Sequence, residues 1–276
     1  MDIQKLASFS DGSDGGNPAG VVVSDTLPAD ADMQAMAAEV GFSETAFAAP
    51  HESGWRVRYF SPESEVPFCG HATIALGAAL ARMHGPDVYP LKLNDADITV
   101  EGFVDGEVYS AALQSPKTTS APADAGLIEK ALSLFGFKQE DLDPRLPPAR
   151  ANAGAEHLII GLRSRELLAA MHYELDAGRQ FMRDAGLVTV MFVYSESAGV
   201  FHSRNPFASG GVYEDPATGA ASAAFAGYLR DLDWPHAGEI DIIQGEDMGS
   251  RSLINARFSG EAGASIRLTG AVRLMD

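Results

Sequence analysis

The chain has 276 residues, of which 46% are hydrophobic and 21% are charged, the balance of an ordinary globular protein. Its 20 basic and 38 acidic residues give a formal net charge of −18 at pH 7. Binding to nucleic acid or to an anionic membrane needs clustered Lys and Arg, so we expect neither as a partner. The length favours two domains over one large core.

The single cysteine, Cys69, rules out an internal disulfide framework and is typical of a reducing compartment. The N-terminal segment does not have the basic region and apolar run of a secretory signal. No uncharged apolar stretch approaches the roughly 20 residues that a membrane-spanning helix needs. We therefore expect a cytoplasmic protein.

The spacing of apolar residues predicts alternating strands and helices in the first half of the chain. One helix is apolar nearly all round, a pattern typical of a helix buried on every side. In order, we predict strands at 6–9 and 20–23, a helix over 29–40 that ends at Gly41, strands at 44–49 and 55–60, the apolar helix over 71–83, two strand-like runs between 91 and 113, and a linker over 114–125.

The second half continues in the same way, without the strict rhythm of a parallel α/β protein. We predict amphipathic helices over 127–137 and 164–177, strands at 157–160 and 188–194, a helix of small residues over 219–229, and strands at 240–244, 251–258 and 264–268.

A weak internal repeat relates the two halves. Residues 66–75 (VPFCGHATIA) and 212–221 (VYEDPATGAA) each join a turn to a helix of small residues. The repeat predicts two similar α+β lobes with curved strands around a central helix, and helix N-termini that point into one cleft. We expect the lobes to span 1–115, completed by a C-terminal strand at 263–276, and 116–262.

Several common site motifs are absent. The sequence contains no P-loop, GxGxxG, HExxH, paired CxxC or GxSxG motif, and its seven histidines are scattered. The loop that starts at Asp11 superficially resembles a calcium loop, but its twelfth residue is Val22 rather than Glu. We therefore expect no metal site and no nucleotide site.

The segment Cys69–Thr73 leads from a turn directly into the apolar helix. The free backbone N–H groups and the dipole at a helix start attract a carboxylate, which would overcome the unfavourable net charge. His71 in the first turn could donate a hydrogen bond or carry a proton. The alternative is structural, with Cys69 as a small buried hydrophobe and His71 as a capping residue.

Two carboxyl groups are further candidates. Asp215 precedes Pro216 and the helix start at Thr218, where its alternative role is that of an ordinary helix cap. Glu44 lies in the apolar segment between Phe42 and Phe47, a setting that favours a general acid or base, although an outward-facing Glu on an edge strand would look the same.

The loops 17–20 and 152–157 could supply amide contacts to a ligand. Asn17 begins the first of them. Turn chemistry explains both loops equally well.

Together these segments resemble the PhzF-like proteins, named for a phenazine-biosynthesis isomerase and related to diaminopimelate epimerase and proline racemase. The resemblance extends in order from residue 15 to residue 229 and is specific for the superfamily rather than for a substrate. The matching segments are GGNPAGVVV, GFSETAFAAP, RYFSPESEVPFCGHATIALGAAL, NAGAEHLII and YEDPATGAASAAFAGYL.

The resemblance implies an α+β fold of two pseudo-symmetric diaminopimelate-epimerase-like lobes, each a barrel-like mixed sheet around a central helix. It also implies a homodimer and no cofactor. Glu44 matches the glutamate that transfers a proton at carbon, and His71 and Asp215 match groups that orient substrate or relay protons. The implied substrate-binding positions are Asn17, Cys69, Gly70, Ala72, Thr73, Thr218, Gly219 and Ala220.

Two positions bear on the reaction. Cys69 and Asp215 fall where the epimerases place their two catalytic cysteines, and Asp in the second position argues against a two-thiol racemase mechanism. The family often has Ser where this chain has Ala220, so we expect a substrate different from that of the phenazine pathway.

We therefore expect an isomerase that moves a proton at carbon on a small anionic, carboxylate-bearing metabolite. Three alternatives remain: an epimerase or racemase of an amino-acid-like substrate, a non-catalytic relative that binds a small molecule, and a hydrolase that uses Glu44 and Asp215 as a carboxylate pair.

Overall fold

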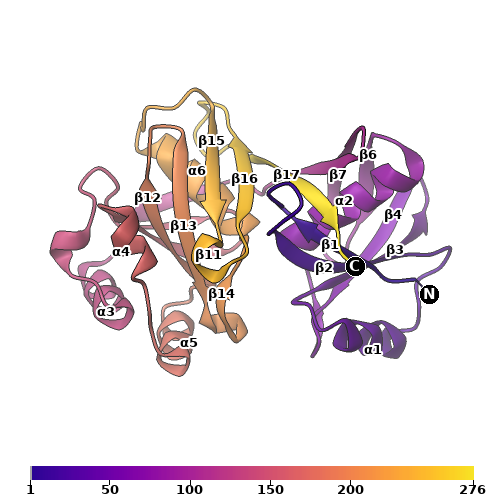
Figure 1. Cartoon of the computed structure of the whole chain (residues 1–276), viewed down its shortest axis with the longest axis horizontal. Helices are drawn as coiled ribbons and strands as arrows, with labels where there is room; N and C mark the ends of the chain where they lie inside the picture. Colours follow the sequence, from indigo (N-terminus) through magenta and orange to yellow (C-terminus); the bar gives the residue numbers. More distant parts are fainter. Residues whose placement is uncertain (1) are drawn as a thin grey trace. The chain divides into compact units, whose positions relative to one another are not determined.

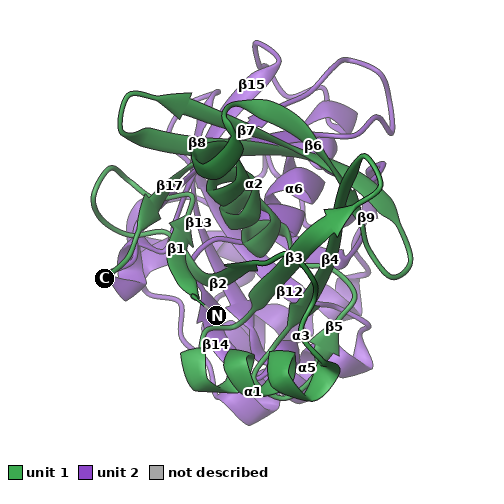
Figure 2. Ribbon diagram, turned by 90° about the vertical axis from the view of Figure 1, so that its right-hand side faces the viewer, with its two compact units in different colours: residues 1–114, 269–276 green, residues 115–268 purple. Residues whose placement is uncertain are grey.

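The computed structural model describes residues 2–276 and divides into two compact α+β units (Figure 1). Unit 1 comprises residues 1–114 and 269–276, and unit 2 comprises residues 115–268 (Figure 2). The C-terminal end of the chain thus returns to the first unit. None of the helices in residues 2–276 has the length and apolar character needed to cross a membrane.

The strands of unit 1 form a closed barrel. The pairings run from β1 through β2, β3, β4, β6, β7, β8 and β17 and back to β1, with β5 added beside β4. The strands are β1 (Gln4–Ser8), β2 (Asn17–Val23), β3 (Thr45–His51), β4 (Gly54–Phe60), β5 (Glu65–Val66), β6 (Asp87–Lys92), β7 (Asp97–Asp105), β8 (Val108–Gln114) and β17 (Arg267–Leu274).

Helix α2 (Gly70–His84) lies among these strands, as Figure 2 shows. Residues 71–81 are buried without interruption, so the predicted all-round burial is confirmed for them, whereas Arg82 and Met83 are exposed. Glycine and alanine dominate this helix because its backbone must approach the surrounding strands closely. A Cβ atom on Gly77 would lie 2.5 Å from Val100 Cγ2, and one on Gly102 would lie 2.5 Å from the Gly77 carbonyl oxygen.

Helix α1 (Asp30–Val40) covers the outside of unit 1. Met33 and Ala37 face Val22, Phe47 and Phe60 in a small apolar cluster. The helix ends as predicted at Gly41, which adopts the left-handed conformation (φ 70°) that favours glycine.

Unit 2 is built on a mixed sheet of order β9–β10–β11–β12–β13–β15–β16, with β14 paired to β13. Helix α6 (Gly219–Asp231) contacts β9, β10, β11 and β16 and is buried over most of its length. The strands are β9 (Thr119–Pro122), β10 (Ala149–Asn152), β11 (Glu156–Leu162), β12 (Thr189–Ser195), β13 (Val200–Phe207), β14 (Val212–Asp215), β15 (Glu239–Gln244) and β16 (Ser252–Arg257).

Three helices pack against the same sheet around a second apolar core, which contains Phe135, Leu158, Met182 and Phe192. Because helices also contact the opposite side, β11 is buried on both faces. The helices are α3 (Ala125–Phe135), α4 (Arg165–Ala169) and α5 (Leu175–Asp184), with short 3-10 turns η1 (Gln139–Asp141), η2 (Ala208–Gly210) and η3 (Glu246–Met248).

Three predictions from local pattern were wrong. The expected linker 114–125 contains β9, which pairs with β10 in the sheet of unit 2. The single helix expected over 164–177 is divided into α4 and α5 by residues 170–174. The last strand begins at Arg267 and extends to Leu274, beyond the predicted 264–268. In each case a pairing with distant residues sets the boundary.

We predict that Gly102→Ala lowers the free energy of unfolding by about 1–3 kcal/mol, the usual cost of overpacking a core. The new methyl group would meet the backbone of α2, which cannot move aside. Chemical denaturation measures the loss. Gly199→Ala is the matched control because its Cβ has no neighbour within 4 Å. Equal stabilities of the two variants would contradict the close helix–strand contact.

The buried His157 on β11 makes the free energy of unfolding depend on pH. Burial lowers its pKa from 6.5 to about 4, although neighbouring Glu156 opposes the shift. Between pH 6.5 and 4 the unfolded chain takes up this proton and the folded chain does not, so stability falls as the pH falls, by roughly 3 kcal/mol from this group.

We expect His157→Gln to flatten the loss of unfolding free energy between pH 6.5 and pH 4, measured by urea denaturation at both values. The same change at the exposed His172 is the control and should retain the wild-type slope. A wild-type slope in His157→Gln would show that His157 is not held neutral by burial.

Candidate active site

The start of α2 leaves its first backbone N–H groups without a side-chain cap. Cys69 is the N-cap residue in an extended conformation, and its side chain makes no capping hydrogen bond. The first turn closes through Thr73 N, which donates to the Cys69 carbonyl oxygen (3.0 Å). The N–H groups of Gly70, His71 and Ala72 precede this bond and carry the positive end of the helix dipole.

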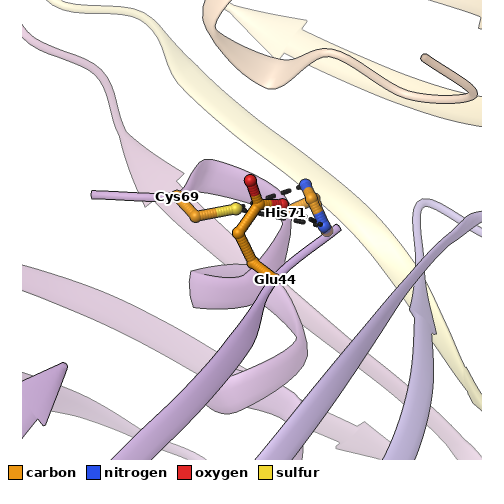
Figure 3. A group of neighbouring side chains, drawn as sticks. All are labelled: Glu44, Cys69 and His71. Atoms are coloured by element: carbon orange, nitrogen blue, oxygen red, sulfur yellow. Dashed lines mark hydrogen bonds and ion pairs between the residues drawn. The ribbon is translucent and has the colours of Figure 1, made fainter. Parts of the chain in front are cut away.

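Glu44, Cys69 and His71 form one group at this helix start (Figure 3). His71 Nε2 lies 3.5 Å from Glu44 Oε2, and His71 Nδ1 lies 3.3 Å from Cys69 Sγ. Ser43 Oγ lies 3.4 Å from His71 Nε2. The exposed fractions of the Glu44 and His71 side chains are 17% and 8%, so the group is shielded and still reached by solvent.

Internal hydrogen bonds hold the backbone of this group in place. Ser8 Oγ donates to the His71 carbonyl oxygen (2.7 Å), and Thr73 Oγ1 donates to the Cys69 carbonyl oxygen (2.7 Å). The Tyr59 hydroxyl pairs with Thr73 Oγ1 (2.7 Å). Burial raises the pKa of Tyr59, so its hydroxyl stays protonated at neutral pH. The Thr73 hydroxyl therefore fixes the helix start.

Asn17 lies at the beginning of β2 and is almost fully buried. It is the cross-strand partner of Ser8, the residue whose hydroxyl binds the His71 carbonyl oxygen. Glu44 comes directly before β3 rather than inside it, and its carbonyl oxygen accepts a hydrogen bond from Gly20 N. The predicted residues of unit 1 are thus placed by neighbouring strands.

In unit 2, Asp215 ends β14 just before α6. Thr218 is the N-cap residue, but its hydroxyl donates to Asp215 Oδ2 (2.5 Å) instead of capping the helix. Gln244 Nε2 donates to the Asp215 carbonyl oxygen (2.6 Å) and to Thr218 Oγ1 (3.0 Å), while Gln244 Oε1 accepts from Thr218 N (3.1 Å). The Asp215 carboxylate is therefore held, while Gly219 and Ala220 begin a helix without a side-chain cap.

An ion pair anchors the strand that carries Asp215. Arg204 Nε and the nearby terminal nitrogen bind both carboxylate oxygens of Glu214, at 3.0 and 2.5 Å. Arg204 also donates to the carbonyl oxygens of Ala169 and Met171 at the end of α4. Both charged side chains are buried. Burying two charges is costly unless they pair with good geometry, and here the guanidinium binds both carboxylate oxygens and makes further hydrogen bonds.

Sequence reasoning missed Gln244 and Asn205. Gln244 is fully buried and belongs to the familiar-looking segment IIQGEDMG, the one signal that pointed to it. Asn205 is the cross-strand partner of Asp215, so the two side chains share one face. Within the described residues, neither polar atom of its buried side chain has a hydrogen-bond partner. Such an amide is a candidate contact for a bound molecule or a water.

The side chain of Asn152 in the loop 152–157 makes the local hydrogen bonds that are typical of a turn. Asn152 Oδ1 accepts from Gly154 N (2.8 Å), and Asn152 Nδ2 donates to Glu156 Oε2 (3.0 Å). His157 is fully buried, and its Nδ1 pairs with Thr189 Oγ1 (2.8 Å). The side chain of Asn152 and the Nδ1 atom of His157 are thus occupied by contacts within unit 2.

The structure thus brings Glu44, Cys69 and His71 together in unit 1, and Asp215 and Thr218 together in unit 2. Each group lies at the uncapped start of a buried helix. A carboxylate beside an imidazole can exchange protons with a bound molecule, and free N–H groups can hold an anion.

Comparison with known proteins shows the family of the chain. The family model of phenazine biosynthesis-like proteins (PhzC-PhzF) matches residues 6–275. A trans-2,3-dihydro-3-hydroxyanthranilate isomerase of Pseudomonas aeruginosa is 31% identical over 250 residues, covering 86% of this chain and 84% of the relative. The isomerase mll1393 of Mesorhizobium japonicum is 30% identical, with coverages of 95% and 92%. The predicted enzyme class, isomerase, is confirmed.

Solved structures show the same fold. A PhzF-family phenazine biosynthesis protein from Bacillus anthracis has a TM-score of 0.88 at 21% identity and covers 100% of this chain and 98% of its own. A hydroxyproline epimerase from Agrobacterium vitis has a TM-score of 0.65 at 11% identity, with coverages of 99% and 88%. The predicted diaminopimelate-epimerase-like α+β fold is confirmed. The chain belongs to the phenazine biosynthesis-like family.

Proposed function

We propose that this protein isomerises a small carboxylate-bearing metabolite by moving a proton at carbon, with Glu44 as the group that removes and returns it. The observation that carries the proposal is the Glu44 carboxylate 3.5 Å from His71 at the uncapped start of α2. Family membership supports it, because the named relatives are isomerases.

The proposed reaction starts with the carboxylate of the substrate at the N–H groups of Gly70, His71 and Ala72. Glu44 takes a proton from a neighbouring carbon, and the electron pair of the broken C–H bond moves into the carboxylate as an enolate. The helix dipole and the N–H groups stabilise the added negative charge. A C=C bond next to this carbon spreads the charge to a second carbon. Glu44 returns the proton there, the C=C bond shifts by one position, and Glu44 regains its initial state. No cofactor is part of this cycle.

His71 has two suitable neighbours for an orienting role. Its Nε2 faces Glu44 Oε2 and Ser43 Oγ. We propose that it orients the carboxylate of Glu44 and donates a hydrogen bond to the substrate. A base and its orienting partner are often farther apart in the free enzyme than in the complex, which suits the 3.5 Å separation.

Asp215 enters the proposal as a polar group that binds a small molecule at the start of α6. Its carboxylate is held by Thr218 and its backbone by Gln244, and the unpaired amide of Asn205 shares its face. Ala220 leaves this helix start without the hydroxyl that the family often has. We propose that the substrate accordingly differs from trans-2,3-dihydro-3-hydroxyanthranilate, the compound in the name of the Pseudomonas relative.

We predict that Glu44→Gln lowers solvent-proton exchange into the substrate by roughly 10²–10⁴-fold, the usual contribution of a general base. Small carboxylic acids, including trans-2,3-dihydro-3-hydroxyanthranilate and trans-4-hydroxyproline, would be incubated in deuterated water with the wild-type protein. Mass spectrometry would then follow deuterium uptake in the acids that exchange. Gln keeps the size of the side chain but cannot accept the proton.

Glu39→Gln is the matched control, because Glu39 is an exposed residue of α1 in the same unit. Wild-type exchange in Glu44→Gln would refute the role of Glu44. Uptake of oxygen-18 from water into the product would instead indicate a hydrolase. An acid that raises the melting temperature without any exchange would indicate a binding protein.

A further inference from the structure

The group Glu44, Cys69 and His71 has a second chemical property. A thiol, an imidazole and a carboxyl group are all metal ligands, and their ligand atoms lie within 4.8 Å of one another (Figure 3). No other cluster of three such groups occurs in residues 2–276. From the sequence we expected no metal site, because the histidines are scattered along the chain. The sequence does not show that Glu44 lies beside the start of α2, where Cys69 and His71 are.

The three ligand atoms lie within 4.8 Å of one another, close to the separations of a tetrahedral zinc site. Zinc bonds of 2.0–2.3 Å place neighbouring ligand atoms roughly 3.3–3.6 Å apart. His71 Nε2 is 3.5 Å from Glu44 Oε2 and 3.9 Å from Cys69 Sγ. Cys69 Sγ lies nearer to His71 Nδ1 (3.3 Å) than to Nε2, so a rotation of the Cys69 side chain toward Nε2 would complete three positions and leave the fourth open.

The chemistry of the ligands selects the metal. Thiolate and imidazole favour zinc over magnesium and calcium, which prefer oxygen ligands. A thiolate and a carboxylate carry two negative charges, which a divalent ion neutralises in a site where both side chains are mostly shielded. The net charge of −18 also attracts cations to the protein.

The ligands are held before any ion arrives. Hydrogen bonds to the carbonyl oxygens of all three residues fix their backbone: Gly20 N binds that of Glu44, Thr73 Oγ1 that of Cys69, and Ser8 Oγ that of His71. A preformed site loses less conformational entropy when it binds a ligand.

We propose that Glu44, Cys69 and His71 bind one Zn²⁺ ion, and that zinc switches off the isomerase reaction. A carboxylate bound to the metal cannot accept a proton from carbon, and the ion would occupy the space between Glu44 and the helix start. Zinc is thus a reversible inhibitor of this site rather than a cofactor. The inhibition rests on the proposed function, whereas the binding does not.

Zinc binding is measured on the full-length protein, first freed of metal, by competition with a chromophoric chelator. We expect one ion per chain, and at least 10-fold weaker binding in Cys69→Ser and in His71→Gln. His51→Gln is the matched control, because His51 is an exposed residue at the end of β3. Melting temperatures verify that each variant is folded.

Co²⁺ gives a readout that does not depend on turnover. A cobalt ion bound here would show a thiolate-to-metal charge-transfer band, which should be absent in Cys69→Ser and present in His51→Gln. The proposal fails if no such band forms, or if zinc binds equally well to Cys69→Ser and His71→Gln, since the ions would then lie on the acidic surface.

The two proposals can fail separately. If Glu44→Gln retains proton exchange while zinc binds with the expected pattern, the proposed role of Glu44 is wrong and the zinc site remains. If Glu44→Gln abolishes exchange and the cobalt band is missing, the zinc site is wrong and the role of Glu44 remains. Zinc that binds at the expected residues without slowing exchange would overturn the inhibition.

Discussion

The close packing of a helix inside a barrel is the constraint on which the first unit depends. Helix α2 passes among the strands, and at Gly77 and Gly102 its backbone and that of β7 approach too closely for a side chain. Its first turn begins at Cys69 without a side-chain cap.

The candidate site follows from that arrangement. The strands around α2 carry Ser8 and Tyr59 to the helix start, where they hold its backbone and first turn in place. Glu44, directly before β3, faces His71 at the same helix start. The hydrogen bonds of Ser8 and Thr73 are made to the carbonyl oxygens of His71 and Cys69 and so fix the backbone at the helix start. The candidate site thus lies on a rigid support, which the proposed proton transfer requires.

In unit 2 the start of a buried helix, α6, is also held in place, but by different residues. Its helix start is organised by Thr218 and Gln244, which hold Asp215, and by the buried ion pair of Arg204 and Glu214. Because a buried charge without a partner is costly, this ion pair ties the position of β14 to the rest of the unit. Both polar atoms of the buried Asn205 side chain have no hydrogen-bond partner within the described residues, and a buried amide of this kind is often completed by a water or a ligand.

The sequence by itself determined the family, the α+β class and the burial of the helix over residues 71–81. These features are local: a run of small apolar residues and a turn motif specify them without reference to distant segments. The positions of α1 and of its final Gly41 were also predictable, since capping depends on adjacent residues.

Only the tertiary structure decided which residues meet. β9 formed within an apparent linker because β10 supplies its partner, and α4 and α5 were separated where Ala169 and Met171 turn their carbonyl groups to Arg204. The 3.5 Å between Glu44 and His71 joins residues 27 positions apart (71 − 44), and Gln244 reaches Asp215 from another strand. Such contacts arise from strand pairing and packing between distant segments, which no local pattern encodes.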